Sequence, residues 1–171
     1  MWEKVGKWVS KKFIQKNIIM FRGTSAITLD SKSRITIPTK YRDELVSDCQ
    51  GKMVCTVDIQ HPCLLLYPLP EWEEIELKLC NLSSMNPQER LLQQVLLGNA
   101  SDCEMDKSGR LLINGPLRNH ASLEKSVMLV GQLKKFEIWS ESAWQAQMQQ
   151  GISKIQSGEI ELTERLLDLS L

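Results

Sequence analysis

The chain has 171 residues, of which 42% are hydrophobic and 25% are charged, and its 21 basic residues balance its 21 acidic ones. This composition excludes an intrinsically disordered chain, and the longest apolar runs are far too short to span a bilayer. No secretory signal with an apolar core and a small-residue cleavage site is evident, so we expect a cytoplasmic protein without a membrane partner.

The lysine-rich segment 1–19 differs from the rest of the chain in charge. It contains five lysines and one glutamate, a net charge of +4 that leaves −4 for the segment 20–171. Large apolar residues recur among these lysines at helical spacing, at Trp2, Val5, Val9 and Phe13. This pattern fits a basic amphipathic helix that touches a membrane surface or a partner. We favour the other interpretation, an extension outside a folded unit that starts at Met20. Any nucleic-acid binding by the net-acidic body must then use a local basic patch.

The patterned part of the chain begins with a strand, a turn and a second strand. Residues 26–29 predict a short strand, and the Asp and Ser side chains of residues 30–33 favour a turn. The alternating residues 34–37 predict a strand that returns alongside the first, so that the two form a hairpin.

A helix, two strands and a second helix follow. We expect the first helix over residues 39–46, with Thr39 as a candidate cap and Tyr41 and Leu45 on its buried face. The two strands are predicted at 52–59 and 63–68. The second helix has glutamates in its first turn, where the helix dipole favours anions. Its predicted buried stripe consists of Trp72, Ile75, Leu79 and Leu82.

A clearly delimited linker helix is predicted over residues 86–98. Asn86 is its expected cap, Pro87 its first residue, and Gly98 its end. The helix separates two similar halves, which gives five predicted units. These are the extension 1–19, a first repeat 20–85, the linker helix 86–98, a second repeat 99–151 and a tail 152–171.

The second half repeats the first. The stretch "MDKSGRLLIN" at 105–114 matches "LDSKSRITIP" at 29–38, and both contain Asp-x-x-x-Arg before an alternating apolar run. A short helix at 116–123, strands at 126–132 and 135–139, and a helix over 140–148 with Ser140 as its expected cap match the later elements. Each half is therefore predicted to run strand–strand–helix–strand–strand–helix.

The repeated Asp-x-x-x-Arg pattern has two interpretations. In the structural one, the Asp side chain accepts N–H groups of the turn and pairs with the Arg, an exposed ion pair that contributes only about 0–1 kcal/mol. In the functional one, a turn at the tip of a two-stranded ribbon projects Lys32 and Arg34, and such a ribbon is narrow enough for the major groove of DNA. Arginine there binds guanine or phosphate through two hydrogen bonds. Repetition at equivalent positions favours the functional interpretation.

Several segments together resemble the MraZ family of bacterial transcriptional regulators. They are "MFRG" from Met20, "LDSKSRITIPTKYRDEL", "MVCTVDIQHPCLLLYPLPEWE", "LSSMNPQER", "LLGNASDCEMDKSGRLLI" and the closing "LTERLLDLSL". The resemblance covers essentially all of residues 20–171. It implies a mainly β fold with short helices (α+β), built from tandem AbrB-like repeats as a swapped-hairpin β-barrel, and a ring-forming homo-oligomer.

The resemblance also implies a function. Members bind short direct repeats of double-stranded DNA upstream of their own gene, commonly as repressors of the division and cell-wall gene cluster, which places them at the nucleoid. Residues implicated in DNA contact fall here on Lys32, Arg34 and Arg110. Arg22 is a further candidate cation near the first turn. The turn-structuring residues are Asp30, Asp106 and Gly109.

One residue of the first turn departs from the family pattern. Ser33 stands where a glycine is usual, and a serine adopts positive φ only with strain. We therefore expect a slightly reshaped or strained first turn and an altered placement of Lys32. The second copy keeps Gly109 but has Ser108 where the first has Lys32.

Other functional classes find less support. The chain has no P-loop, nucleophile elbow or H-E-x-x-H motif, so neither an enzyme nor a cofactor is predicted. His61 and Cys63 lie two positions apart without a second ligand pair, so no metal site is expected. The five cysteines form no C-x-x-C and predict free, mostly buried thiols. The remaining alternative is a ring-shaped structural or adaptor protein that binds protein partners.

Overall fold

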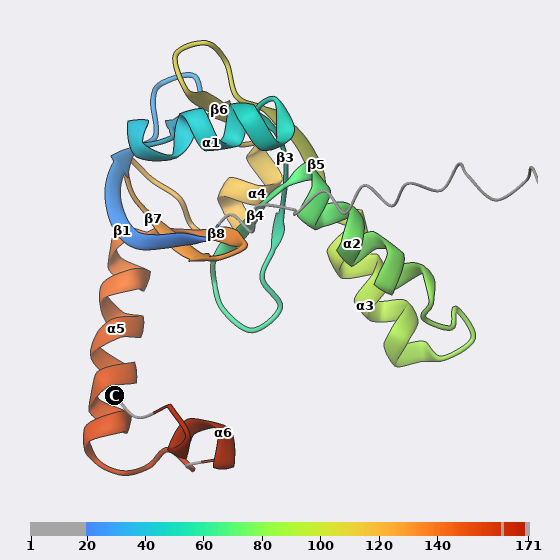
Figure 1. Ribbon diagram of the computed structural model, residues 1–171, viewed down its shortest axis with the longest axis vertical. Helices are drawn as coiled ribbons and strands as arrows, with labels where there is room; N and C mark the ends of the chain where they lie inside the picture. Colours follow the sequence, from blue (N-terminus) through green and yellow to red (C-terminus); the bar gives the residue numbers. More distant parts are fainter. Residues whose placement is uncertain (1–19, 162, 170–171) are drawn as a thin grey trace, which may run out of the picture.

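The computed structural model describes residues 20–161 and 163–169, so the predicted extension 1–19 lies outside the described part (Figure 1). Eight strands are found there: β1 Phe21–Thr28, β2 Arg34–Thr36, β3 Lys52–Val57, β4 Leu64–Pro68, β5 Ser101–Glu104, β6 Arg110–Leu112, β7 Ser126–Leu133 and β8 Lys135–Ser140. The helices are α1 Thr39–Cys49, α2 Leu69–Cys80, α3 Pro87–Gly98, α4 Gly115–His120, α5 Glu141–Gln156 and α6 Glu164–Leu167. The predicted element order of both halves is confirmed.

The pairing of the strands corrects one prediction. The hairpin expected between residues 26–29 and 34–37 is wrong, because β1 pairs antiparallel with β7 and β2 pairs antiparallel with β6. The second pairing sets Ile35 opposite Leu111, and both side chains are fully buried. Pairing across the halves therefore buries the apolar faces of both short strands in one core, which local alternation alone does not specify.

The two halves are related by an approximate twofold axis. The six-stranded sheet has the order β1-β7-β8-β4-β3-β5, and the Asp-x-x-x-Arg turns at Asp30 and Asp106 occupy equivalent positions of the two halves. Under this relation β1 corresponds to β5, β3 to β7 and β4 to β8, so the sheet order reads the same from either end. Each half thus contributes one edge strand, β1 or β5, that pairs with a strand of the other half, and neither half forms the sheet alone.

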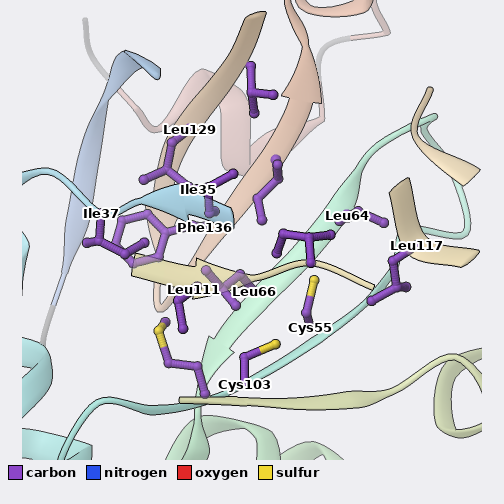
Figure 2. Close-up of a cluster of buried hydrophobic side chains, with 14 of the residues drawn as sticks. Ile35, Ile37, Cys55, Leu64, Leu66, Cys103, Leu111, Leu117, Leu129 and Phe136 are labelled. Carbon is purple, nitrogen blue, oxygen red and sulfur yellow. The ribbon is translucent and has the colours of Figure 1, made fainter. Parts of the chain in front are cut away.

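A single apolar cluster joins the halves. Ile35 and Ile37 of the first half and Leu111 and Ile113 of the second are all 0% exposed and pack with residues of the large sheet such as Phe136. Figure 2 shows Ile35, Ile37 and Leu111 close to Leu66 of β4, Leu129 of β7 and Phe136 of β8. Four of the five cysteines are buried, as predicted, and Cys80 is exposed.

The helix ends mostly follow the sequence signals. The Asn86 side chain accepts hydrogen bonds from the backbone N–H groups of Gln88 and Glu89, and Ser140 caps α5 at Ala143, as predicted. Thr39 is not the cap of α1, because it is the first helical residue and Pro38 precedes it without a side-chain bond. In the stripe of α2, Trp72 and Leu79 are buried, but Leu82 follows the end of the helix.

The helices after the sheet strands project from the core. Figure 1 shows α2 and α3 extending together to one side, while α5 runs away from the sheet and carries α6 at its far end. The side chain of Gln93 on α3 donates a hydrogen bond to the carbonyl of Leu79 on α2. Neither α3 nor α5 contains a buried residue. No helix of the described part is long and apolar enough to cross a membrane.

Candidate nucleic-acid interface

The first Asp-x-x-x-Arg segment forms a tight, internally bonded turn. The backbone N–H of Ser33 donates to the carbonyl of Asp30, and the N–H of Asp30 donates to the carbonyl of Arg34, both at 2.9 Å. The Asp30 carboxylate accepts the N–H groups of Lys32 at 2.8 Å and Arg34 at 2.9 Å. The predicted turn is confirmed. Its two arms then diverge, because β1 and β2 pair with different strands.

The arginine of this turn is held by the aspartate. Arg34 Nε and Nη2 lie 2.8 and 2.7 Å from Asp30 Oδ2, so the guanidinium is fixed before any ligand binds. The hydrogen bonds from Arg34 hold the pKa of Asp30 below its ordinary value. The side chain of Arg34 keeps 26% of its surface exposed. Two of the five N–H donors of the guanidinium are used in this way, which leaves three for a ligand.

The second turn reproduces the first. Asp106 accepts the backbone N–H groups of Ser108 and Arg110 and the Nε–H of Arg110, at 2.8, 2.9 and 2.8 Å. The backbone and side-chain bonds of Arg110 lower the pKa of Asp106. Ser33 and Gly109 have φ of +62° and +77°, so both turns use the left-handed region at the same position. The expected reshaping of the first turn is therefore wrong. The expected strain remains, and it lies on Ser33.

Backbone hydrogen bonds place the two turns beside the same short ribbon. The N–H of Ile113 donates to the carbonyl of Ser33 at 2.9 Å, and the N–H of Ile37 donates to the carbonyl of Gly109 at 2.7 Å. Because side chains alternate along a strand, Arg34 and Arg110 lie on the face opposite the buried Ile35 and Leu111. The predicted ribbon, in which the turn joins its two strands at the tip, is wrong; the structure has a different two-stranded ribbon, β2 paired with β6, and one turn lies beside each of its strands. Both turns lie at the same end of the molecule (Figure 1).

Two arginines that sequence reasoning missed brace this ribbon. Arg42 on α1 donates its Nε–H to the carbonyl of Ile37 at 2.7 Å, and Arg118 on α4 donates to the carbonyl of Ile113 at 3.1 Å. A Cβ atom on Gly109 would overlap Arg42 Nε, so Arg42 of the first half rests directly on the turn of the second. The signal was present in the sequence, because Arg42 and Arg118 are separated by the same offset as the two turns.

The structure does not bring Arg22 to the first turn. Arg22 is exposed near the start of β1, whereas the turn follows its end, and at about 3.3 Å per residue roughly 20 Å of strand separates them. Its carbonyl accepts the hydroxyl of Tyr41 at 2.6 Å. Lys40 Nζ lies 4.7 Å from the centre of the Tyr41 ring. Arg22 and Lys40 therefore place two cations beside the start of α1, at a distance from Lys32.

The residues considered for metal binding have other contacts. The Cys63 thiol is buried with Sγ 3.8 Å from Asp58 Oδ2, and its pKa is raised by burial first and then by Asp58. The His61 ring packs against Trp139 at 5.7 Å between centroids. Within the described residues, no group of three or more His, Cys, Asp or Glu side chains is arranged to hold a metal ion.

Comparison with known proteins places the chain in a family. The family model described as "MraZ protein, putative antitoxin-like" matches residues 20–95 and again residues 96–168. The chain belongs to the MraZ family. The "Transcriptional regulator MraZ" of Colwellia psychrerythraea is 91% identical over 152 residues, which cover 89% of this chain and all of that relative. The proteins of the same name from Pseudoalteromonas atlantica and Enterobacter sp. are 66% and 60% identical with the same coverage.

The twofold match of the MraZ model agrees with the internal repeat seen in the structure. Each matched region contains one Asp–Arg turn and the strands that follow it. The first match of the family model begins at residue 20, after the lysine-rich segment. The turns, the ribbon and the two bracing arginines therefore all lie within the part of the chain shared with the MraZ relatives.

Proposed function

We propose that this MraZ-family chain is a sequence-specific DNA-binding transcriptional regulator, a repressor of the division and cell-wall gene cluster that binds direct repeats upstream of its own gene. The observation that carries the proposal is the paired arrangement of the turns. One turn from each half is bonded to the same exposed ribbon, which carries Arg34 and Arg110 on its outer face. The names of the relatives support a role in transcription.

The ribbon has the chemistry for reading bases. A two-stranded β-ribbon fits the major groove, where arginine donates two hydrogen bonds to guanine and apolar side chains contact the thymine methyl group. Arg34 lies opposite Leu112 in the ribbon, and Leu112 is 59% exposed although it is apolar. The ion pairs with Asp30 and Asp106 fix both arginines in advance, which reduces the entropy lost on binding.

The surrounding cations supply phosphate contacts. Lys32 is exposed at the tip of the first turn and Lys107 at the tip of the second, and Arg22 is a further exposed cation that lies beside α1, away from both tips. These few cations neutralise few phosphates, so one subunit alone binds weakly. Tight binding to a promoter then requires several subunits that engage several repeats together.

Self-association as a ring provides this multivalency. The exposed large apolar residues of α3 and α5 are the surfaces that support it, namely Leu91, Leu97, Met148, Ile152 and Ile155. Sites linked in a rigid assembly make later contacts intramolecular and raise avidity by roughly 10²–10⁴. The repeats must lie on one face of the duplex, about 10 base pairs apart or a multiple of it.

The test uses the full chain and promoter fragments with one, two or three repeats. In a mobility-shift titration, affinity should rise steeply with the number of repeats and fall when a half-turn of DNA is inserted between them. Equal affinity for one repeat and for three would contradict the multivalent mechanism. The same exposed helices would serve the alternative, a ring-shaped structural or adaptor protein, which predicts no binding to any fragment.

A further inference from the structure

A groove runs beside the ribbon on the first half of the molecule. It has a volume of about 400 Å³ and lies between the free edge of β1, the end of β2 and the start of α1. Its lining residues are Ser25, Ala26, Ile27, Thr28, Thr36, Ile37, Pro38, Thr39 and Arg42. None of the hydrogen bonds described above within the two turns involves a side chain that lines this groove.

The lining of this β1–α1 groove suits a phosphate. Among the described residues that line it, four side chains carry hydroxyl groups, none is acidic, and Arg42 supplies the cation. The Nε–H of Arg42 is bonded to the carbonyl of Ile37, whereas its terminal nitrogens have no hydrogen bond or ion pair within the described residues. A phosphodiester accepts both hydroxyl donors and a guanidinium that presents parallel N–H groups.

Arg42 also connects this groove to the other half. Its guanidinium rests on Gly109, whose carbonyl accepts the N–H of Ile37 at 2.7 Å. The groove therefore ends directly at the second turn, which presents Lys107 and Arg110. The groove and the second turn are therefore adjoining surfaces.

The pseudo-equivalent surface of the second half has the opposite character. At the offset that relates Asp30 to Asp106, the residue equivalent to Thr28 is Glu104 and the residue equivalent to Ala26 is Asp102. Both are exposed carboxylates on β5. The threonines at positions 36 and 39 become leucine and glycine. Lys52 lies opposite Glu104 in the β3–β5 pairing and offsets at most one of the two negative charges. Like charges repel, so this surface disfavours a phosphate.

We propose that the β1–α1 groove is a DNA-phosphate subsite present in the first half only, which gives each subunit a fixed polarity on the duplex. The inference rests on the proposed DNA-binding function and goes beyond it. A protein with an intact twofold axis matches the twofold axis of the duplex and binds it equally in both directions. The hydroxyl-lined groove on one side and the paired carboxylates on the other remove that equivalence.

The experiment compares matched variants on a promoter duplex by fluorescence anisotropy of the full chain. Thr28→Glu places in the groove the residue type found at the equivalent position of the second half, Glu104, and should weaken binding at least tenfold. Thr28→Ser keeps the hydroxyl group and should stay within twofold. Arg42→Gln should weaken binding about tenfold and lower the salt slope by about one. Glu104→Thr, the change on the other half, should stay within twofold, and Arg118→Gln, which removes only a bracing contact to the ribbon, should weaken binding less than Arg42→Gln does.

Phosphate-ethylation interference tests the polarity itself. With the Arg42→Gln variant, ethylation of one phosphate per DNA repeat, always on the same strand, should no longer interfere with binding. With Arg42→Lys, ethylation of that phosphate should still interfere. Thr28 is exposed, so Thr28→Glu reports on the groove even if Arg42→Gln loosens the second turn. Melting temperature and gel filtration check that Thr28→Glu keeps the fold and the oligomer; a changed oligomer would overturn the proposal.

The outcomes separate this inference from the proposed function. If the parent chain fails to bind promoter DNA, the proposed function fails. If the parent binds and Arg34→Ala does not, but Thr28→Glu and Arg42→Gln bind like the parent, only the phosphate subsite is overturned. Equal losses in Arg42→Gln and Arg118→Gln, at phosphates related by a twofold axis, would overturn the polarity.

Discussion

The two Asp-x-x-x-Arg turns have the same backbone but different surroundings. In both, the aspartate accepts two backbone N–H groups and the Nε–H of the arginine, and a residue with positive φ precedes that arginine. A bracing arginine, Arg42 or Arg118, lies at the same position of the following helix. Ser33 nevertheless stands in the first turn where the second has Gly109, and Glu104 and Asp102 lie beside the second turn where the first has Thr28 and Ala26. The duplication has retained what the turn needs to fold, while the surface beside the turn has diverged.

The two turns also differ in how an arginine packs on the residue with positive φ. Arg42 packs on Gly109 where no Cβ is present, whereas the residue at the equivalent position of the first turn has one. The bond from Arg118 to its carbonyl is 3.1 Å long, against 2.7 Å for Arg42. Arg118 Nη2 instead lies 3.6 Å from the Cβ position of Gly115. The residue with positive φ is thus glycine in the turn on which Arg42 packs and serine in the other turn.

Removing either turn arginine, Arg34 or Arg110, should have the largest effect on DNA binding. Arg34→Ala should reduce promoter binding at least 100-fold, because one lost bidentate contact costs about 1–3 kcal/mol and recurs in every subunit. Arg110→Ala should cost about tenfold, since its turn has Ser108 in place of a lysine. Mobility-shift titration measures both, with Arg90→Ala on α3 as the control. Parent-like binding of Arg34→Ala would show that the turns are scaffold only.

Gly109→Ala should be the most destabilising single change in the turns. A left-handed alanine costs about 1–2 kcal/mol and its Cβ would displace Arg42, so we expect a loss of about 2 kcal/mol or more. For a chain of this size that lowers the melting temperature by about 4–8 °C. Gly98→Ala is the matched control, because nothing lies within 4 Å of its Cβ position. Equal melting temperatures for the two variants would contradict the role of the Arg42 contact.

Ser33→Gly should shift stability in the opposite direction and by less. Glycine relieves the strain at φ +62° but increases the conformational entropy of the unfolded chain, so the net gain is about 0.5 kcal/mol. Chemical denaturation measures this gain, with DNA affinity as a second measurement. A destabilised Ser33→Gly would mean that the serine side chain makes a contact that outweighs the strain.

Lowering the pH should remove the stabilising contribution of the turn aspartate equally in both halves. The folded-state pKa values of Asp30 and Asp106 are lowered, so their contribution is complete above the unfolded pKa of about 3.9 and is lost as pH falls through the folded value. Asp30→Asn and Asp106→Asn should each reduce the loss of stability between pH 4.5 and pH 3. Urea midpoints at pH 7, 4.5 and 3 provide the measurement. An unchanged acid response in both variants would contradict the assigned cause.

The sequence was informative where a short segment satisfies its own bonds. Asp30 to Arg34 predicts its turn because the acceptor, the donors and the arginine all lie within that segment. Asn86 and Ser140 predict their caps for the same reason. Arg42 was missed because its contact with Gly109 joins the two halves of the chain, and no local pattern carries that contact. The position of Arg22 was misjudged because its distance from the turn depends on the length of β1.

By itself, the sequence determined the repeat, the order of strands and helices, the two turns and the family. These follow from local periodicity, side-chain capping and recurrence at a fixed offset, which are all properties of neighbouring residues. Only the tertiary structure decided that β2 pairs with β6 rather than with β1, because either pairing satisfies the alternation of Ile35 and Ile37. That choice depends on burying the apolar faces of both halves together. It also places the two turns on one ribbon and brings Arg42 against Gly109.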